Sequence, residues 1–390
     1  MPQPTFLAAI GFTKDNANST LSAAVAAGAT VIPITSTNIP ASSTIIIIDG
    51  ANTEVRAVTA GGGTNSLTVA ALTNAHSANM YVFSQLTAAY GPTDWMPITT
   101  FNRHAAIMQL PDRALRGSAV EAYGSSAGVR SGTFTIAGPV FTDVFPYLIG
   151  GVTGATDFTG GTPNQHAFSV KNTGDSQPTP LALWVRTAID TRIFVGARVS
   201  KLLINFDTSQ LLAYSADIVT WMGGPVTAAP APSYSAITPV PSWQCQATIA
   251  GTAVLFVRKS SVTVERTAQP IFTLQGIPDP YKVFAGPQKA DIMLDAVMED
   301  NGEFNRYLLT TQPVLDLKYT AAGANPITLT VHATKANYDD IVLTDTGQDY
   351  ISLVATATCL ANTTDATTAG TGQAPVKITA TSTKATGYYL

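Results

Sequence analysis

The sequence predicts a mainly β protein with two similar all-β units in tandem, each a barrel or sandwich with one short flanking helix, behind a small N-terminal β module. Two observations favour this fold class. Short β-rich segments separated by turn residues run along the whole chain, and one order of elements occurs twice. The first copy has a strand at 132–138 and a helix at 141–150, and the second has a strand at 289–297 and a helix at 301–309. Internal repeats decide architecture, so this duplication is the main feature of the sequence.

The composition limits the classes of protein that fit. The 390 residues suffice for two or three domains with a core in each. Charged residues are only 12% of the chain, about half of the usual ~25%, and the net charge is −4. Tight nucleic-acid binding requires clustered lysines and arginines, which this chain lacks. Either neighbouring subunits cover much of the surface, or the chain is an ordinary Thr-rich β protein.

Membrane insertion, secretion and a disulfide framework are not expected. No apolar run approaches the ~18 residues of a membrane span. The first residues lack the basic and apolar segments of a secretory signal. Cys245 and Cys359 are too few for a disulfide framework and are expected to be buried free thiols.

The first unit, residues 1–88, is predicted to be the small N-terminal β module. Its expected strands, separated by Gly, Asn and Pro, are 30–35, 44–48, 54–58 and 66–69. A spacing of about ten residues between such strands is typical of a compact sandwich or barrel.

The second unit, residues 92–228, is predicted to open with a long hairpin from Ile98 to Ile136. The helix follows this hairpin. Thr142 is expected to cap the helix, and Pro146 must lie in its first turn because proline has no N–H to donate further along.

A pair of strands, 194–207 and 210–221, is predicted to close this unit, with a turn at Asp207-Thr-Ser-Gln210. Alternation of apolar residues predicts one buried face. The residues expected on that face are Val199, Leu203 and Ile204 in the first strand and Leu212, Tyr214, Ala216 and Ile218 in the second.

A Pro/Ala-rich linker, 229–241, is predicted before the third unit, 242–390. In that unit Asp300-Asn-Gly-Glu303 matches a capping box that opens the helix. The expected inward face of this helix consists of Phe304, Tyr307 and Leu308. A loop over 362–372 precedes a last strand at 375–380.

The motifs of the second unit resemble the first half of the major tail tube protein of siphophages, the bacteriophages with long non-contractile tails. The motifs that carry this resemblance are Leu115-Arg-Gly-Ser118, Gly132-Thr-Phe-Thr-Ile-Ala-Gly138, Tyr147-Leu-Ile-Gly-Gly151 and the segments 166–174, 180–184 and 194–202. The resemblance covers residues 92–388. The leading module is similar to small β modules at the front of phage structural proteins, with Leu72-Thr-Asn-Ala-His76 and Val82 as the cue.

The resemblance implies two tail-tube domains, 92–228 and 242–390, whose copies join sheet to sheet into rings. The rings stack into a hollow tail through which DNA is ejected into the host, and two fused domains imply three chains per ring. The implied partners are the chain itself, the tail terminator, tape measure and tail tip proteins, and DNA that passes without specific binding. No cofactor and no membrane are implied. The implied location is the virion tail, assembled in the host cytoplasm.

Four carboxylates are expected to line the bore of such a tube, because an acidic or neutral wall prevents DNA from adhering. These residues are Asp217, Asp291, Asp295 and Glu299. They alternate with apolar neighbours, so one strand face is expected to be wet and the other packed. The alternative is that they occupy ordinary solvent-side positions on a half-buried sheet.

Two loops, 105–130 and 269–287, occupy equivalent places in the two copies and are expected to contact the next ring. The residues expected at these contacts are Asp112, Arg113, Arg116, Glu121, Tyr123, Pro278, Tyr281 and Lys282. The alternative is that both are ordinary flexible surface loops. The N-terminal module is expected to project from the outer wall, unless Phe6, Ile10 and Phe12 reach an adjacent subunit as an arm.

No catalytic or metal site is predicted, and the chain is not expected to be an enzyme. Gly124-Ser-Ser-Ala-Gly128 fits the string of a nucleophile elbow, but 129–136 is expected to be a strand, where that motif requires a helix. The five small residues are typical of a loop tip. The histidines at 76, 104, 166 and 332 are isolated in the sequence, without the spacing of metal ligands.

Two rival functions remain open from the sequence. One is another phage structural role, as a baseplate or capsid-decorating protein. The other is a carbohydrate-binding surface protein or adhesin, which needs exposed aromatic platforms. The four tryptophans lie at strand positions or strand ends, where burial is expected instead: Trp95, Trp184, Trp221 and Trp243.

Overall fold

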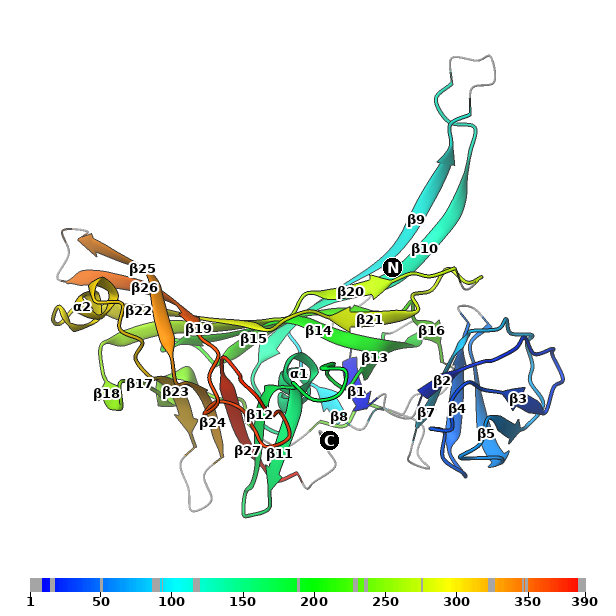
Figure 1. The fold of residues 1–390 in the computed structure, drawn as a ribbon, viewed down its shortest axis with the longest axis horizontal. Coiled ribbons are helices and arrows are strands. Elements are labelled where there is room, and N and C mark those ends of the chain that lie inside the picture. The colour runs from blue at the N-terminus through cyan, green and yellow to red at the C-terminus, as the bar shows by residue number, and fades with distance from the viewer. Residues whose placement is uncertain are drawn as a thin grey trace.

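The computed structural model describes residues 9–14, 18–49, 52–85, 92, 94–114, 120–187, 190–226, 231–234, 238–274, 276–321, 327–345, 347 and 350–384. Strands dominate this part of the chain, and its two α-helices are α1 (Pro146–Thr153) and α2 (Gly302–Leu308). The predicted fold class, mainly β with two short helices, is confirmed. Figure 1 shows an elongated body with a small β module at one end and a long hairpin that rises from the body.

The N-terminal module is a six-stranded antiparallel sheet in the order β2-β7-β4-β5-β6-β3. Its strands are β2 (Asn18–Thr20), β3 (Val31–Pro33), β4 (Thr44–Ile48), β5 (Glu54–Ala60), β6 (Ser66–Val69) and β7 (Tyr81–Gln85). A bridge between Leu21 and Ile34 joins the ends of the two edge strands, so the sheet curls around its core. Ile32, Ile45 and Val82 are fully buried in that core.

A buried ion-pair network crosses this module. His76 is 2% exposed, its Nδ1 lies 3.0 Å from Asp49 Oδ2, and its Nε2 lies 2.6 Å from Glu54 Oε1. Burial alone lowers the pKa of His76, but the hydrogen bonds and charges of the two carboxylates outweigh it, so the pKa is raised above 6.5. Burial likewise opposes the ionised form of Glu54, yet hydrogen bonds from Thr73, His76 and Asn74 leave its pKa below 4.5.

These shifts predict how the stability of the module depends on pH. The contribution of protonated His76 is complete below the unfolded-state pKa of 6.5 and is lost as pH rises through the higher folded-state pKa. We expect the thermal unfolding of the module, followed by circular dichroism, to shift to lower temperature as pH rises above 6.5. His76→Gln is expected to remove most of this shift. An unchanged shift in that variant would assign the pH dependence to other groups.

The first described strand, β1 (Ala9–Lys14), does not belong to the module. It lies between β8 (Asp94–Met96) and β13 (Leu181–Arg186) in the body. Ile10 and Phe12 are 0% and 1% exposed in the core of their own chain. The alternative prediction that these two residues reach an adjacent subunit as an arm is therefore wrong. Phe6 lies outside the described residues.

Eight strands of the body form one continuous antiparallel path that contains the duplication. The first copy supplies β9 (Thr100–Asp112), β10 (Gly124–Pro139), β15 (Ala213–Thr220) and β14 (Thr191–Asp207), in that spatial order. The second supplies β19 (Val257–Glu265), β22 (Lys289–Val297), β26 (Ile351–Cys359) and β25 (Ala336–Asp345), in the same order. β14 pairs with β19, so the last strand of one copy adjoins the first strand of the next.

The duplication holds at the level of single residues. β14 has a register shift against β15 between Val199 and Lys201, and β25 has one against β26 between Tyr338 and Asp340. Cross-strand partners correspond between the copies. Thr135 pairs with Asp217 in the first copy as Met293 pairs with Thr356 in the second, and Lys201 pairs with Asp217 as Asp340 pairs with Thr356. Positions 135, 217 and 201 of the first copy therefore correspond to 293, 356 and 340 of the second.

A seven-stranded sheet forms a second layer, in the order β11-β12-β27-β24-β23-β17-β18. Its strands are β11 (Gly154–Thr159), β12 (Asn164–Val170), β17 (Cys245–Ile249), β18 (Thr252–Val254), β23 (Leu315–Thr320), β24 (Thr328–Ala333) and β27 (Lys377–Ser382). The last strand, β27, pairs with β12 of the first copy and β24 of the second. The halves on either side of the predicted linker thus share one hydrophobic core.

Several local predictions need correction. Pro146 does open α1, but no side chain caps that helix, so Thr142 does not have its predicted role. α2 has no side-chain cap either; Glu303 is buried and accepts a 2.6 Å hydrogen bond from the hydroxyl of Tyr338. Leu308, predicted to face inward, is 60% exposed.

Two further corrections concern burial. The turn at Asp207–Gln210 is confirmed by a 2.9 Å bond from Gln210 N to Asp207 O. The register shift before Lys201, however, puts Leu202 and Ile204 in the core and leaves Leu203 half-buried on the other face. Three tryptophans are buried as predicted, whereas Trp243, in the middle of the short 3-10 turn η3 (Ser242–Gln244), is 68% exposed.

Candidate assembly surfaces

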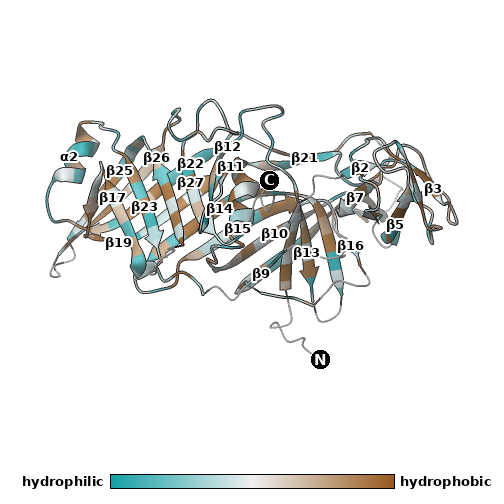
Figure 2. Cartoon of the chain, turned by 90° about the horizontal axis from the view of Figure 1, so that it is seen from below, coloured by the Kyte–Doolittle hydropathy of each residue, from teal (hydrophilic) through white to brown (hydrophobic). Residues whose placement is uncertain are grey.

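One face of the eight-stranded path is open, except around Val195, Val219 and Trp221, which pack in a cluster with residues 268 and 283 and with the N-terminal module. The other face packs on the seven-stranded sheet, and the alternation of apolar and polar residues along the strands is visible in Figure 2. In Figure 1 the open face forms the concave upper side of the body. Asp217, Asp291 and Asp295 are half-buried on this open face. Glu299 lies outside the strands, in the exposed segment after β22.

The carboxylates on the open face have nearby partners. Arg258 Nη2 donates a 2.5 Å bond to Asp295 Oδ1, and Lys289 Nζ lies 2.8 Å from Asp291 Oδ2. Asp217 Oδ1 accepts a 2.7 Å bond from the hydroxyl of Thr135. The open face is therefore a mosaic of paired charges and hydroxyls rather than a uniformly acidic wall.

Two sheet edges lie at opposite ends of the path. Within the described residues, β9 pairs with β10 alone and β25 pairs with β26 alone. Leu343 in β25 is 40% exposed, whereas the corresponding Ile204 in β14, which has β19 on its other side, is 0% exposed. An unpaired edge exposes backbone donors and acceptors together with side chains that a further strand would bury.

The two predicted ring-contact loops are hairpin arms, both continuing strands of the path. The first arm, residues 107–130, extends β9 and β10 far beyond the body (Figure 1). Gly124–Gly128 belongs to β10 and is not a loop tip. The second arm, residues 266–288, contains β20 (Ala268–Ile271) and β21 (Lys282–Ala285) and lies against β14 and β15.

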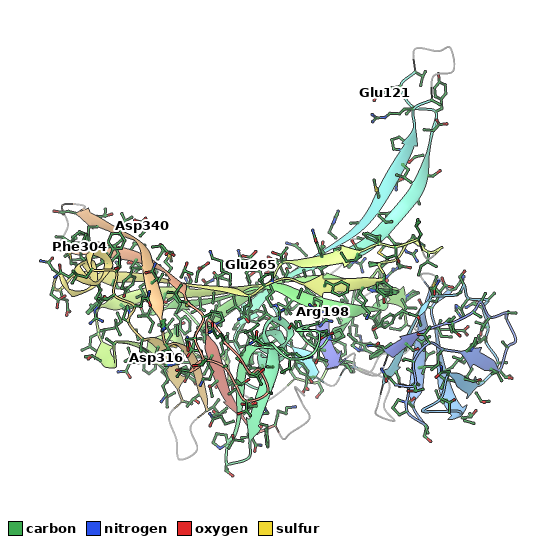
Figure 3. The ribbon with its side chains drawn as sticks, viewed as in Figure 1. Glu121, Arg198, Glu265, Phe304, Asp316 and Asp340 are labelled. Carbon is green, nitrogen blue, oxygen red and sulfur yellow. The ribbon has the colours of Figure 1, made fainter. Side chains whose placement is uncertain are left out.

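The ring-contact candidates are distributed along these arms. Asp112, Arg113, Glu121 and Tyr123 lie near the end of the first arm, and Figure 3 shows Glu121 at its far end. Arg116 lies outside the described residues. On the second arm, Tyr281 is 49% exposed and Lys282 Nζ lies 5.5 Å from the centre of its ring. Pro278 is near the tip of that arm.

The sequence analysis missed the contact that joins the two arms. Arg130 donates from Nε and Nη2 to the two carboxylate oxygens of Asp279, at 2.8 and 2.7 Å. The backbone N–H of Arg130 also donates to Pro278 O at 2.9 Å. Asp279 is 4% exposed, so this is a buried bidentate pair. No local signal could reveal it, because 149 residues separate the partners.

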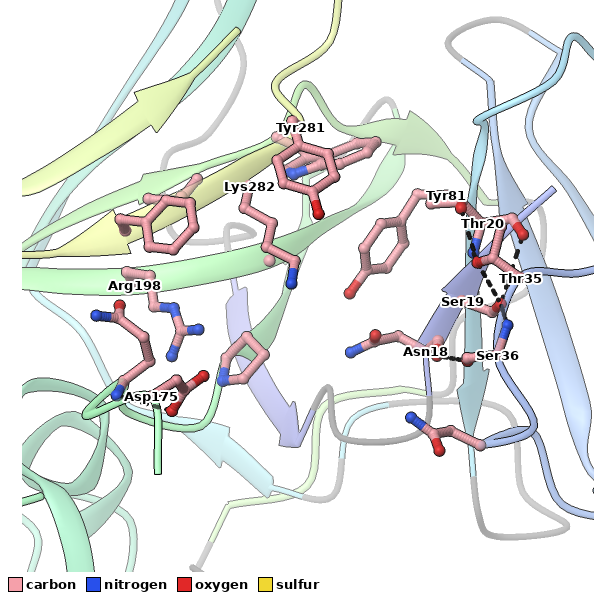
Figure 4. Close-up of a pocket in the computed structure, with 17 residues that line it drawn as sticks. Asn18, Ser19, Thr20, Thr35, Ser36, Tyr81, Asp175, Arg198, Tyr281 and Lys282 are labelled. Carbon is pink, nitrogen blue, oxygen red and sulfur yellow. Dashed lines mark hydrogen bonds between the residues drawn. The ribbon is translucent and has the colours of Figure 1, made fainter. Parts of the chain in front are cut away.

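The module is packed firmly against the body. Ile46, Ile48, Tyr81 and Phe83 of the module share a buried cluster with residues of β13 and β14, with Trp184 at 0% exposure. Beside this cluster lies a pocket of about 400 Å³ between the module, β14 and β21 (Figure 4). Its lining combines aromatic rings with polar and charged groups, among them Asn18, Tyr81, Asp175, Arg198, Tyr281 and Lys282.

Two further kinds of feature are absent from the described residues. None of the helices there is long and apolar enough to cross a membrane. Nor does this part of the chain hold a group of three or more histidine, cysteine, aspartate or glutamate side chains in an arrangement that could bind a metal ion.

Comparison with protein families gives a match over most of the chain. A family model described as phage tail tube protein matches residues 109–381, which run from the first arm through both copies to β27. No curated protein matches the chain. The matched range leaves the N-terminal module outside.

Proposed function

Because the chain belongs to the phage tail tube protein family, we propose that it is the major tail tube subunit of a phage with a long non-contractile tail. Its chains join into rings, and the rings stack into a hollow tube through which phage DNA passes to the host. The family is a structural kind of protein, and no catalytic step is part of this proposal.

The pairing of β14 with β19 inside the chain carries the proposal. It joins the end of one four-stranded copy to the start of the other. The edges left over, β25 and β9, correspond to β14 and β19 respectively. A β25–β9 contact between chains therefore repeats a contact that the chain already makes within itself. Such a head-to-tail contact closes into a ring when its rotation divides the circle, and three chains of two copies satisfy this in pseudo-sixfold symmetry.

The duplication also supplies the register of the contact between chains. Leu203 stands opposite Thr263 and Ile204 opposite Val262 in the β14–β19 pair. The corresponding residues are Val342 and Leu343 in β25, and His104 and Arg103 in β9. We expect Val342 of one chain to stand opposite His104 of the next, with both side chains on the open face.

The open face is then the wall of the bore. Its mixture of paired charges with few free cations supports passage of DNA without adhesion, since each Lys–phosphate contact adds affinity. Asp217, Asp291 and Asp295 lie on this wall in the proposal, and Glu299 lies at its border. Tail terminator, tape measure and tail tip proteins are the proposed partners at the ends and inside the tube, and assembly takes place in the host cytoplasm.

Cysteine cross-linking tests both the contact and its register. The double variant V342C/H104C is expected to form disulfides between chains on oxidation and to stop at covalent rings of three. L203C/T263C, at the matched positions of the internal pair, is the control and is expected to cross-link within one chain. Cys245 and Cys359 interfere little, because burial raises the pKa of each thiol to about 12 and keeps it protonated.

A cysteine pair shifted by one residue tests the register and is expected not to cross-link. V342C/R103C places the two thiols on opposite faces of the sheet, since a slip of one residue reverses every side chain. Stronger linking in this pair than in V342C/H104C would refute the register. Electron micrographs of the purified protein separate a tube subunit, which forms rings or long hollow filaments, from a baseplate or capsid-decorating protein on the same β unit.

A further inference from the structure

We propose that the first arm, residues 107–130, lies across β25 and β26 of the adjacent chain in the same ring, rather than reaching the next ring. This inference rests on the proposed function and names a second copy of the chain as the occupant of that surface. Its basis is the second arm, which already makes the corresponding contact within a single chain.

The contact within the chain is extensive. The second arm begins where β19 ends and lies over β14 and β15, the neighbouring copy across the β14–β19 junction. Val283 and Ala268 of the arm share a buried cluster with Trp221 and Val195 of that copy. Arg266, at the base of the arm, is 3% exposed and donates to the carbonyl oxygens of Gly286, Thr153 and Ser176.

The two arms are equivalent parts of the duplication. Ala106 and Ser131, which flank the first arm, pair with each other and correspond to Glu265 and Lys289, which also pair. Between these positions the first arm has 24 residues and the second has 23. Both arms have a one-residue register shift near the base, from Ala106–Ser131 to Gln109–Ala127 and from Glu265–Lys289 to Ala268–Ala285, and the extra residue of the first arm lies beyond the last pairs, Asp112–Gly124 and Ile271–Lys282. Both arms therefore leave the sheet at the same place and with nearly the same length.

The surface for the first arm follows from the same correspondence. Val219 and Trp221, which pack in one cluster with the second arm and the module, correspond to Thr358 and Leu360 at the end of β26. Arg198 in β14 corresponds to Asn337 in β25. All three residues of the second copy are half-buried in the single chain. The small residues Gly124–Gly128 allow the backbone of the first arm to approach such a surface closely.

The first arm exposes apolar side chains of the kind that contacts between proteins bury. Four of its apolar side chains are exposed in the single chain: Ile107 at 42%, Met108 at 55%, Leu110 at 46% and Val120 at 57%. On the second arm, Val283 and Ala285 are only 4% and 6% exposed, whereas Ile271, Leu274, Tyr281 and Phe284 remain exposed, so that arm buries one of its faces. Contact with a second copy would remove apolar area of this kind from water.

The end of the arm has a matching site. Within the chain, the tip of the second arm bonds to Arg130 at the base of the first arm. Arg130 corresponds to Gln288, at the base of the second arm. The side-chain oxygen and nitrogen of Gln288 are buried without a hydrogen-bond partner in the described part of the chain. We expect residues 120–123, at the end of the adjacent chain's first arm, to reach this amide.

The direction of the arm agrees with a contact inside the ring. In Figure 1 the strands of the path follow one another across the picture, and the first arm rises within that plane. In the view turned by 90°, the arm does not project beyond the body (Figure 2). A contact between stacked rings requires projection out of the plane in which the strands follow one another.

Disulfide trapping tests the inference in assembled tubes. Ala268 of the second arm, which packs in the cluster with Val219, corresponds to Gln109 of the first arm, and Val219 corresponds to Thr358. In a chain carrying Cys245→Ala and Cys359→Ala, Q109C/T358C is expected to link most chains, with a ladder that stops at three. A268C/V219C is the matched control within one chain. Mixing chains with Q109C alone and chains with T358C alone is expected to give linked dimers.

The outcomes separate this inference from the proposed function. If V342C/H104C links chains but Q109C/T358C does not, the arm lies elsewhere and this inference is overturned, while the tube function stands. A Q109C/T358C ladder that continues beyond three chains shows arms that bridge rings and also overturns it. If neither pair links and the chain stays single at high concentration, the proposed function itself fails.

Discussion

Replacing Leu343 with Asp is expected to abolish ring and tube formation while leaving the single chain as stable as before. Leu343 is 40% exposed on the β25 edge, and the corresponding Ile204 is 0% exposed beside β19. In the ring, Leu343 is expected to be buried in the same way, and burying an unpaired carboxylate costs several kcal/mol. In the free chain the substitution is expected to change the unfolding free energy by no more than about 0.5 kcal/mol.

A neighbouring residue provides the control for this prediction. Val342→Asp places the same charge one residue away, on the open face, where the corresponding Leu203 is half-buried and not part of the core. Val342→Asp is expected to assemble as the unmodified chain does. Sedimentation velocity measures the size of the assemblies that each variant forms, and negative-stain microscopy shows whether they are rings and tubes. Normal tubes from Leu343→Asp, or loss of tubes from both variants, would reject the edge contact as proposed.

Trp184→Ala is expected to produce the largest loss of stability. Trp184 is 0% exposed in the cluster that joins the module to β13 and β14. Truncating a buried tryptophan removes its transfer free energy and leaves a cavity, which together cost about 3–5 kcal/mol. We expect denaturant unfolding, followed by circular dichroism, to shift accordingly and the module to separate from the body at a lower denaturant concentration.

Trp243→Ala is the matched control, because Trp243 is 68% exposed. Its effect on the unfolding free energy is expected to stay within about 0.5 kcal/mol. A loss below about 1 kcal/mol for Trp184→Ala would mean that the cluster collapses around the gap or contributes little to docking the module.

Much of the body could be predicted because the signals are local. The pair of strands around Asp207–Gln210 follows from alternation and a turn sequence, and the place of Pro146 follows from its missing N–H. The duplication was visible in the order of elements, although the two copies share few residues. The open face with Asp217, Asp291 and Asp295 followed from the two-residue period of a strand.

The errors arose where distant parts of the chain meet. A register shift of one residue moved Leu203 out of the core, and no sequence pattern specifies where such a shift occurs. Glu303, in α2, does not have its predicted capping role; its carboxylate accepts a hydrogen bond from the buried hydroxyl of Tyr338 in β25. β1 pairs with β13, which lies far away in the chain, and Ile10 and Phe12 are therefore not available as an arm. β27 likewise pairs with the distant strand β12.

The sequence by itself determined that the chain is a tandem of two β units with short helices, because strand period, turn residues and proline act within a few residues of each other. The tertiary structure decided which edges remain unpaired, which arm is already engaged, and which carboxylates have partners. Those features depend on side chains such as Arg130 and Asp279, which 149 positions separate and only packing brings together.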